Sequence, residues 1–163
     1  MIIVADSSPF VLLVSIEQVE VLASLFKDVI IPPQVQAELS SPKRSEIVRA
    51  FIAAPPPWLR VVSPKLIEPI DGLHPGEAAA ISLARELRAD RVVIDERLGR
   101  QAASQRGLHV IGTVGVLEAA AERGFVDLGV AFEKVKETDF WVSPRFLDER
   151  LALFVARKRP GST

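Results

Sequence analysis

The chain has no cysteine and only two histidines, His74 and His109, among its 163 residues. The lack of cysteine excludes a disulfide scaffold, thiol catalysis and a cysteine-based zinc site. Two histidines are too few for a histidine-rich metal site. Any metal site in this chain is therefore built mainly from oxygen ligands.

Long apolar runs and phosphate-binding glycine motifs are missing as well. No uncharged stretch approaches the roughly 18 residues that a membrane helix needs. The N-terminus carries no basic stretch before its apolar residues, which argues against a signal peptide. Neither GxxxxGK[ST] nor GxGxxG occurs, so a P-loop or a dinucleotide-binding site is not expected. We expect a cytoplasmic protein with no membrane partner.

The charges nearly cancel: 20 Lys and Arg stand against 21 Asp and Glu, a formal net charge of −1. This balance neither favours nor excludes nucleic acid as a partner, because local patches decide that. An apolar fraction of 48% and a charged fraction of 25% are those of an ordinary globular protein. The length predicts a single domain over residues 1–157, followed by a flexible basic and Pro/Gly/Ser tail at 158–163.

Short β-branched runs alternate with longer helical patterns. Strands are expected at 2–5, 29–31, 60–62, 91–94 and 109–111. Helices are expected at 9–14, 16–26, 34–39, 45–53, 76–88, 97–106 and 114–123, and another after Pro144. The proline-rich stretch 63–75 is expected to be a loop. Because the strands are apolar on both faces, the pattern predicts an α/β fold with a parallel sheet.

Four acidic residues occupy positions near the ends of these elements. Asp6 and Asp95 directly follow apolar strands, Glu77 opens a helix, and Glu38 lies late in a short helix. The carboxyl ends of parallel strands are where α/β proteins bind ligands. Carboxylates gathered there repel one another unless a divalent cation holds them, and oxygen ligands suit Mg²⁺ or Mn²⁺. The acids therefore indicate metal-dependent phosphodiester chemistry.

Each acid also has a structural alternative. Asp6 and Asp95 are suitable helix N-caps, and Glu77 complements the dipole of the helix that it opens. Glu38 lies near a helix C-terminus, where negative charge is disfavoured, so it needs a partner. That partner is either a metal ion or a surface ion pair with a basic residue that follows, Lys43 or Arg44.

Four further residues are candidates for contacting substrate. Ser7 follows Asp6 and is placed to support it or to hold a water bound to the metal. Arg97 and Arg100 share one helix face close to Asp95, where guanidinium groups suit a phosphate. A solvated helix face is the alternative for both arginines. Thr113 follows the last strand, where it faces the same crevice or caps a helix.

Five segments occur in order on the expected elements: Val4-Ala5-Asp6-Ser7-Ser8, Pro32-Pro33-Gln34-Val35-Gln36-Ala37-Glu38-Leu39, His74-Pro75-Gly76-Glu77-Ala78, Val93-Ile94-Asp95-Glu96-Arg97-Leu98-Gly99-Arg100 and Gly112-Thr113-Val114-Gly115. Together they resemble the PIN-domain family of ribonucleases. The match is best with the branch described as predicted PIN-like nucleic-acid-binding proteins, related to VapC-type toxins. The resemblance covers about residues 1–125.

The resemblance implies a three-layer α/β/α sandwich with a central parallel sheet. It also implies that Asp6, Glu38, Glu77 and Asp95 form an acidic quartet that binds Mg²⁺ or Mn²⁺ and cleaves single-stranded RNA. Relatives of the VapC type act with a cognate antitoxin and form homodimers, so the resemblance implies both partners here.

Two features depart from the family pattern. Glu77 stands where many members have Asp, and a longer side chain alters the spacing of a metal site. Residues 138–157, which include Trp141 and the last helix, do not match the common family end. A non-catalytic PIN-like module that binds RNA or a protein partner therefore stays an alternative. A response-regulator-like phosphoacceptor is disfavoured, because Asp6 is followed by serines and no lysine closely follows the last strand.

Overall fold

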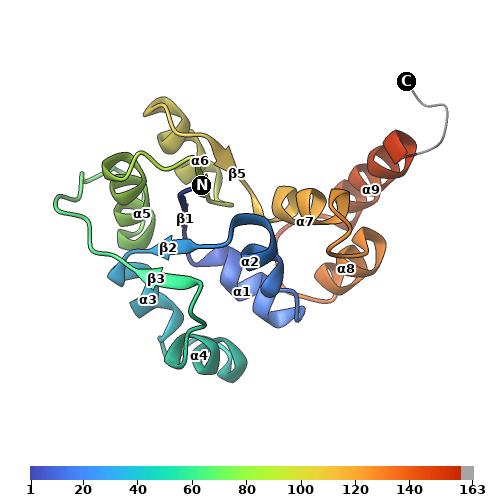
Figure 1. Ribbon diagram of the computed structural model, residues 1–163, viewed down its shortest axis with the longest axis horizontal. Coiled ribbons are helices and arrows are strands. Elements are labelled where there is room, and N and C mark those ends of the chain that lie inside the picture. The colour runs from blue at the N-terminus through green and yellow to red at the C-terminus, as the bar shows by residue number, and fades with distance from the viewer. Residues whose placement is uncertain (159–163) are drawn as a thin grey trace.

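A five-stranded parallel sheet forms the centre of the molecule, with the strand order β3-β2-β1-β4-β5 (Figure 1). The structure is a computed structural model and describes residues 1–158. The strands are β1 (Ile3–Ala5), β2 (Val29–Ile31), β3 (Leu59–Val61), β4 (Arg91–Val93) and β5 (Val110–Ile111). The expected α/β class with a central parallel sheet is confirmed, and each strand lies within one residue of its expected bounds.

Nine helices connect and extend the strands within the described part of the chain. They are α1 (Ser8–Ser15), α2 (Glu20–Phe26), α3 (Pro33–Leu39), α4 (Glu46–Ala53), α5 (Pro75–Glu86), α6 (Arg97–Gln105), α7 (Thr113–Glu122), α8 (Leu128–Lys136) and α9 (Pro144–Lys158). The loop expected before α5 is confirmed. The flexible tail is expected from residue 158, but Lys158 is the last residue of α9. The rest of that expected tail, 159–163, lies outside the described residues.

Two helical features differ from expectation. The helix expected over 16–26 begins only at Glu20, because Glu17 adopts a left-handed backbone conformation with φ of 60° and separates α1 from α2. Helix α8 was not expected at all. Asp127 caps it by accepting a hydrogen bond from the backbone N–H of Val130 at 3.0 Å, which is the one clear start signal in that stretch.

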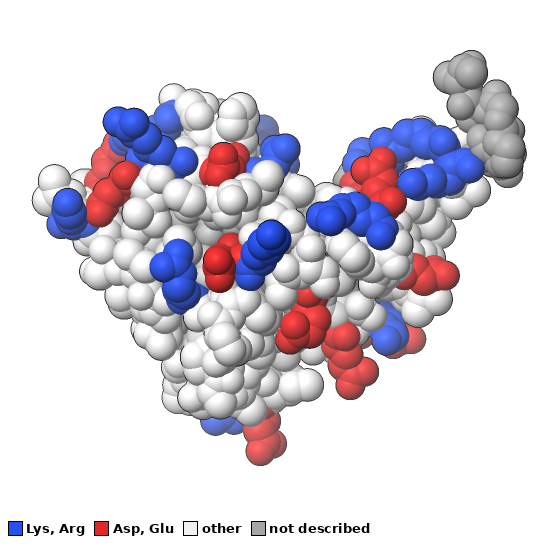
Figure 2. All heavy atoms as spheres, viewed as in Figure 1, with Lys and Arg blue, Asp and Glu red and all other residues white. Residues whose placement is uncertain are grey.

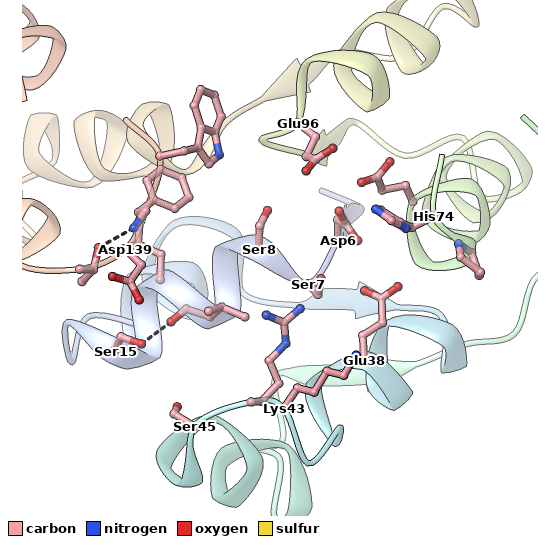
Figure 3. Close-up of a pocket in the computed structure, with 18 of the residues that line it drawn as sticks. Asp6, Ser7, Ser8, Ser15, Glu38, Lys43, Ser45, His74, Glu96 and Asp139 are labelled. Atoms are coloured by element: carbon pink, nitrogen blue, oxygen red, sulfur yellow. Dashed lines mark hydrogen bonds between the residues drawn. The ribbon is translucent and has the colours of Figure 1, made fainter. Parts of the chain in front are cut away.

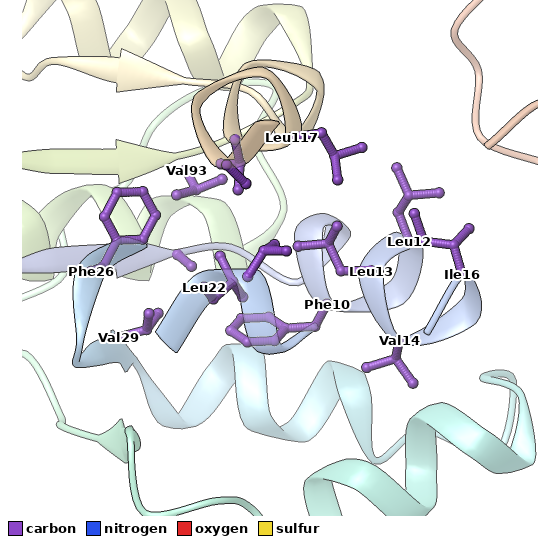
Figure 4. Packing of buried hydrophobic residues seen from close by; sticks show 14 of the residues in the cluster. Phe10, Leu12, Leu13, Val14, Ile16, Leu22, Phe26, Val29, Val93 and Leu117 are labelled. Atoms are coloured by element: carbon purple, nitrogen blue, oxygen red, sulfur yellow. The ribbon is translucent and has the colours of Figure 1, made fainter. Parts of the chain in front are cut away.

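The side chains of the strands alternate between two apolar layers, as the two-residue period of a strand requires. Ile3 and Ala5 of β1 pack on one face, in a cluster with residues of α1, α2, α7 and α8 (Figure 4). Val4 points to the opposite face and packs against α5 and α6. Helices therefore cover both faces of the sheet, and the expected three-layer α/β/α sandwich is confirmed.

The C-terminal helices extend the layer that contains α7. Leu147 is the one residue of α9 that is fully buried. The Arg150 guanidinium donates two hydrogen bonds to the carboxylate of Glu118 in α7, at 3.0 and 2.6 Å. This paired contact fixes the middle of α9 to the rest of the molecule.

Among residues 1–158, no single helix is both long and apolar enough to cross a membrane. Helices α1 and α2 meet that criterion only when counted together, and they are bent by 119° where they join.

Candidate functional site

Strand register brings the two aspartates to the same edge of the sheet. Ala5 of β1 pairs with Val93 of β4, and the backbone N–H of Asp6 donates to the carbonyl oxygen of Val93 at 3.0 Å. Val93 in turn pairs with Ile111 of β5, so Asp95 and Thr113 leave the sheet side by side. Asp6 and Asp95 therefore both lie just beyond the carboxyl ends of adjacent strands.

Three of the four candidate acids line one pocket of about 870 Å³, and they come from three separate elements. Asp6 follows β1, Glu38 comes from α3, and Glu77 from the first turn of α5. Figure 3 shows Asp6, Glu38 and Glu96 on one side of this pocket and Asp139 on the opposite side. Asp95 lines a second pocket, of about 810 Å³.

Among the four acids, Asp6 has the pKa that is shifted furthest from its ordinary value. Its side chain is 4% exposed, and its Oδ1 atom is buried without a hydrogen-bond partner. Burial raises the pKa of Asp6 to about 7, although a hydrogen bond from the Ser7 backbone opposes the rise. The carboxylates of Glu38, Glu77 and Asp95 also raise it. Each of the other three acids therefore lies within electrostatic reach of Asp6.

Glu77 repeats this combination of burial and an unpartnered oxygen. It is 4% exposed, and its Oε2 atom is buried with no hydrogen-bond partner. Burial raises the pKa of Glu77, and the carboxylate of Glu96 raises it further, while His74 lowers it. Gly99 of α6 lies close by, since a Cβ built on it would come 3.5 Å from Oε2 of Glu77. The same Cβ would come 2.9 Å from Cγ2 of Ile94, so it is the packing of α6 against Ile94 that requires glycine here.

Glu38 is held by the backbone of α5. Its Oε1 atom accepts a hydrogen bond from the N–H of Gly76 at 3.1 Å. A Cβ on Gly76 would overlap the Glu38 carboxylate, so this approach requires glycine. In the described part of the chain, Glu38 forms no ion pair with Lys43 or Arg44. The alternative of a surface ion pair for Glu38 is therefore not observed.

Asp95 is the best satisfied of the four. Its Oδ2 atom accepts hydrogen bonds from the hydroxyls of Ser8, at 2.7 Å, and Thr113, at 2.6 Å. Its Oδ1 atom accepts from the backbone N–H of Thr113 at 2.7 Å. Three donors fix the orientation of this carboxylate.

Neither aspartate acts as a helix N-cap. Ser7 occupies the N-cap position of α1, and Glu96 occupies that of α6. Asp6 caps no helix, and Asp95 does not cap the helix that follows it but accepts the N–H of Thr113 at the start of α7.

Of the four residues predicted to contact substrate, three line a pocket and the fourth, Thr113, does not. Ser7 lines the first pocket, and Arg97 and Arg100 line the second. Arg100 also donates to the carbonyl oxygen of Ile94 at 3.0 Å, which ties it to the end of β4. Thr113, in contrast, is fully buried and directed at Asp95, so the structure gives it a positioning role.

Sequence reasoning missed two contributors to the site. Ser8 donates to Asp95 across 87 positions of the sequence, and Glu96 acts on the pKa of Glu77. The adjacent serines after β1 were visible as a motif, but only the pairing of β1 with β4 shows which serine meets Asp95. The effect of Glu96 on the pKa of Glu77 could not be predicted, because it depends on how closely the start of α6 lies to α5 in space.

The chemistry of the donor set suits a hard divalent cation, because two buried carboxylate oxygens lack partners and several acids repel one another. The side chains are not arranged around a common point, however. Within residues 1–158, no three His, Asp or Glu side chains are placed to hold one metal ion. Metal binding at this site therefore requires side-chain rotation toward the free oxygens of Asp6 and Glu77.

Comparison with known proteins identifies the family. The family model described as DUF3368, a PIN domain, matches residues 2–155. A solved structure of a PilT N-terminus domain protein, SSO1118, from the hyperthermophilic archaeon Sulfolobus solfataricus P2, has a similar fold, with a TM-score of 0.57 and 20% sequence identity. That match covers 75% of this chain and 95% of the archaeal one. No curated protein matches the chain significantly. The chain belongs to the PIN-domain family, whose fold is of the nuclease type.

Proposed function

We propose that the protein is a Mg²⁺- or Mn²⁺-dependent endoribonuclease that hydrolyses RNA phosphodiester bonds at Asp6, Glu38, Glu77 and Asp95. One observation carries this proposal. Asp6 and Glu77 each keep a buried carboxylate oxygen without a partner, at the edge of the sheet where the two other acids also lie. An unpartnered buried carboxylate is unfavourable in itself, and a cation is the partner that best offsets the cost of several such groups together.

The four acids have different tasks in this proposal. Asp6 and Glu77 offer their free oxygens as metal ligands, while Ser8 and Thr113 hold Asp95 in one orientation. A divalent ion, when bound, lowers the pKa of a coordinated water and stabilises the charge that develops on the phosphate. Glu38, whose carboxylate accepts the backbone N–H of Gly76 in α5, would supply a further ligand from α3.

The predicted substrate residues surround this centre. Ser7 lies beside Asp6 in the first pocket, where its hydroxyl orients a water or the substrate. Arg97 and Arg100 lie beside Asp95 in the second, where a guanidinium neutralises a phosphate of the strand. The scissile phosphate is thus expected at the boundary between the two pockets.

The direct test is cleavage of labelled RNA by the wild-type protein and by Asp6→Asn in the presence of Mn²⁺. We expect cleavage by the wild type that EDTA abolishes, and a loss of at least about a hundredfold in the variant, because a metal ligand is removed. Asp71→Asn is the matched control, because Asp71 is exposed in the loop before α5. Unchanged cleavage by Asp6→Asn rejects the site.

A non-catalytic RNA- or partner-binding module is the second candidate. The observation in its favour is that no three acids in the described residues are arranged to hold one ion. A Mn²⁺ titration followed by the melting temperature separates the candidates. A metal enzyme is stabilised in a saturable way, because the ion binds the folded state, and Asp6→Asn abolishes the effect. A binding module shows no saturable shift.

We extend the proposal to the cellular role: the protein acts in the cytoplasm as the toxin of a toxin–antitoxin pair and works as a homodimer. Resemblance to VapC-type proteins supports this role. Induced expression of the wild type is then expected to arrest bacterial growth, whereas Asp6→Asn at the same protein level is harmless. Equal growth with both proteins rejects the toxin role without affecting the nuclease assay.

A further inference from the structure

The segment between α8 and α9 places an exposed tryptophan at the candidate active site. Trp141 is 67% exposed, although an indole ring is among the most favourable groups to bury. Residues 137–141 of this segment line the first pocket, opposite the acids. An aromatic ring in solvent at the edge of a pocket that contains charged side chains is available to stack on a flat ligand.

Trp141 also lies at the junction of the two pockets, since it lines both of them. One pocket contains Asp6, Glu38 and Glu77, and the other contains Asp95. The indole thus borders both the pocket with three of the candidate acids and the pocket with the fourth.

The Trp141 ring packs against the neighbouring ring of Phe140. The Phe140 ring lies 5.8 Å from the Trp141 ring, at an interplanar angle of 34°, and Phe140 packs against the main apolar cluster. The Thr138 hydroxyl holds the turn by donating to the carbonyl of Val135 at 2.7 Å and by accepting from the N–H of Phe140 at 3.2 Å. These contacts fix the backbone that presents the indole, which lowers the entropy lost on stacking.

Cationic side chains accompany the ring in each pocket. Lys43 and Arg44 line the first pocket, and Arg97 lines the second. None of the three forms an ion pair within residues 1–158. Figure 2 shows Lys and Arg mixed with Asp and Glu over one face of the molecule, in line with the net charge of −1. The first pocket contains more carboxylates than cations, so a phosphate would be attracted at Lys43, Arg44 and Arg97 individually and not by the pocket as a whole.

We propose that Trp141 is a base-stacking platform that selects unpaired RNA, with the cations of the two pockets holding the phosphates on either side of the stacked nucleotide. An aromatic surface flanked by cations is the arrangement by which proteins bind single strands with little sequence preference. Bases in a duplex are already stacked on one another and cannot reach the ring. The proposal rests on the proposed nuclease function and adds to it the residue that contacts a base of the single strand.

Tryptophan fluorescence tests this inference without cleavage. The chain contains two tryptophans, so Trp58→Phe leaves Trp141 as the only emitter. With EDTA present, we expect a short unstructured RNA to quench the emission in a saturable way and a blunt-ended RNA duplex to have little effect. If Trp58→Phe does not fold, the difference in quenching between the wild type and Trp141→Phe supplies the same information.

Substitution measures the contribution of the ring. We expect Trp141→Ala to raise the Kd for unpaired RNA by about 5- to 150-fold, the range typical of one lost base stack, and Trp141→Phe to restore part of the affinity. Phe125→Ala is the control, because Phe125 is also an exposed aromatic residue and lies outside both pockets. Lys43→Ala is expected to reduce the salt dependence of binding, whereas Lys65→Ala, in a loop outside both pockets, is not.

The outcomes distinguish this inference from the nuclease proposal. Quenching by unpaired RNA without any Mn²⁺-dependent cleavage supports the platform and rejects the enzyme. Cleavage that Trp141→Ala leaves unchanged, with no quenching, rejects the platform alone. A change in the elution volume of Trp141→Ala, without an effect on RNA binding, assigns the ring to a contact between protein chains and also overturns the inference.

Discussion

At the scale of single residues, the ionisation of Asp6 has a direct effect on stability. Its pKa is about 7 in the folded protein, against an ordinary value of 3.8. The folded state therefore binds the proton more tightly, so folding stability is highest below the ordinary pKa and falls as the pH rises to about 7. Above pH 7 the whole difference, on the order of 4 kcal/mol, acts against the fold.

Asp6→Asn removes this penalty because asparagine stays neutral. In EDTA, we expect the variant to gain about 2 to 3 kcal/mol over the wild type between pH 5 and pH 8. Urea unfolding at the two pH values measures the gain, and Asp71→Asn should show no such trend. A gap between variant and wild type that is equal at both pH values would mean that the Asp6 carboxyl ionises normally.

We expect Thr113 to affect stability and activity by orienting Asp95, not by contacting the substrate. Thr113→Val keeps the shape of the buried side chain but removes the hydroxyl that donates to Asp95 at 2.6 Å. We expect a loss of about 1 to 3 kcal/mol in stability, as is usual for a hydrogen bond to a charged group, and a drop in cleavage of about 10- to 100-fold. Unfolding curves and cleavage rates test this, with Ser24→Ala, which loses an exposed neutral bond, as the control.

The acids could be predicted from the sequence because each has a local signal, such as a charged residue directly after an apolar strand. Their partners could not. The hydrogen bonds from Ser8 and Thr113 to Asp95 connect residues 87 and 18 positions apart and depend on strand order. That Asp6 and Glu77 each keep a buried oxygen without a hydrogen-bond partner also could not be predicted, because it depends on tertiary packing.

At the scale of elements, the start of α5 is shaped around Glu38. Gly76→Ala would add a methyl group where the Glu38 carboxylate lies, and so displace it. We expect the variant to fold but to bind Mn²⁺ about 10- to 100-fold more weakly, because a supporting contact of the ligand is lost. Calorimetric titration with Mn²⁺ measures this change.

Gly129→Ala in α8 is the matched control. Its added methyl group would meet Asp127 and Leu151 only at 3.4 and 3.8 Å, which is ordinary contact. It should leave Mn²⁺ binding unchanged and stabilise the helix by about 0.5 to 1 kcal/mol. Equal Mn²⁺ affinity in both variants would show that Glu38 takes no part in the metal site.

Most elements were predictable because their signals are local. The strands are β-branched runs, and α5 begins with Pro75 followed by a broad apolar face. Helix α8 was missed because Gly129 and Val130 weaken the helical pattern in its first turn, whereas its stability comes from buried Phe132 and Val135. Tertiary burial overrides weak propensity there.

At the scale of the whole molecule, α9 is expected to contribute stability and a surface for association. Deleting residues after Ser143 removes fully buried Leu147, worth about 1.5 to 3 kcal/mol, and leaves Glu118 without Arg150. We expect a lower melting temperature for this reason. Phe146, Leu153 and Val155 are large apolar residues of α9 that remain exposed.

Size-exclusion chromatography of the same truncation tests the homodimer. Loss of the dimer would assign the exposed apolar side chains of α9 to the interface. A dimer that persists at a lower melting temperature would leave α9 with a purely internal role, and no change in either property would rule out both roles.

The order of strands has a consequence for how the protein is made. The strand synthesised first, β1, is the middle strand of the finished sheet, with β2 on one side and β4 on the other. A nascent chain that ends before Asp95 can pair β1 with β2 and β3, but it lacks the second aspartate and the α7 residue that orients it. A fragment released before Thr113 is made would thus lack part of the candidate site, and we expect any activity of that site to require the chain at least through α7.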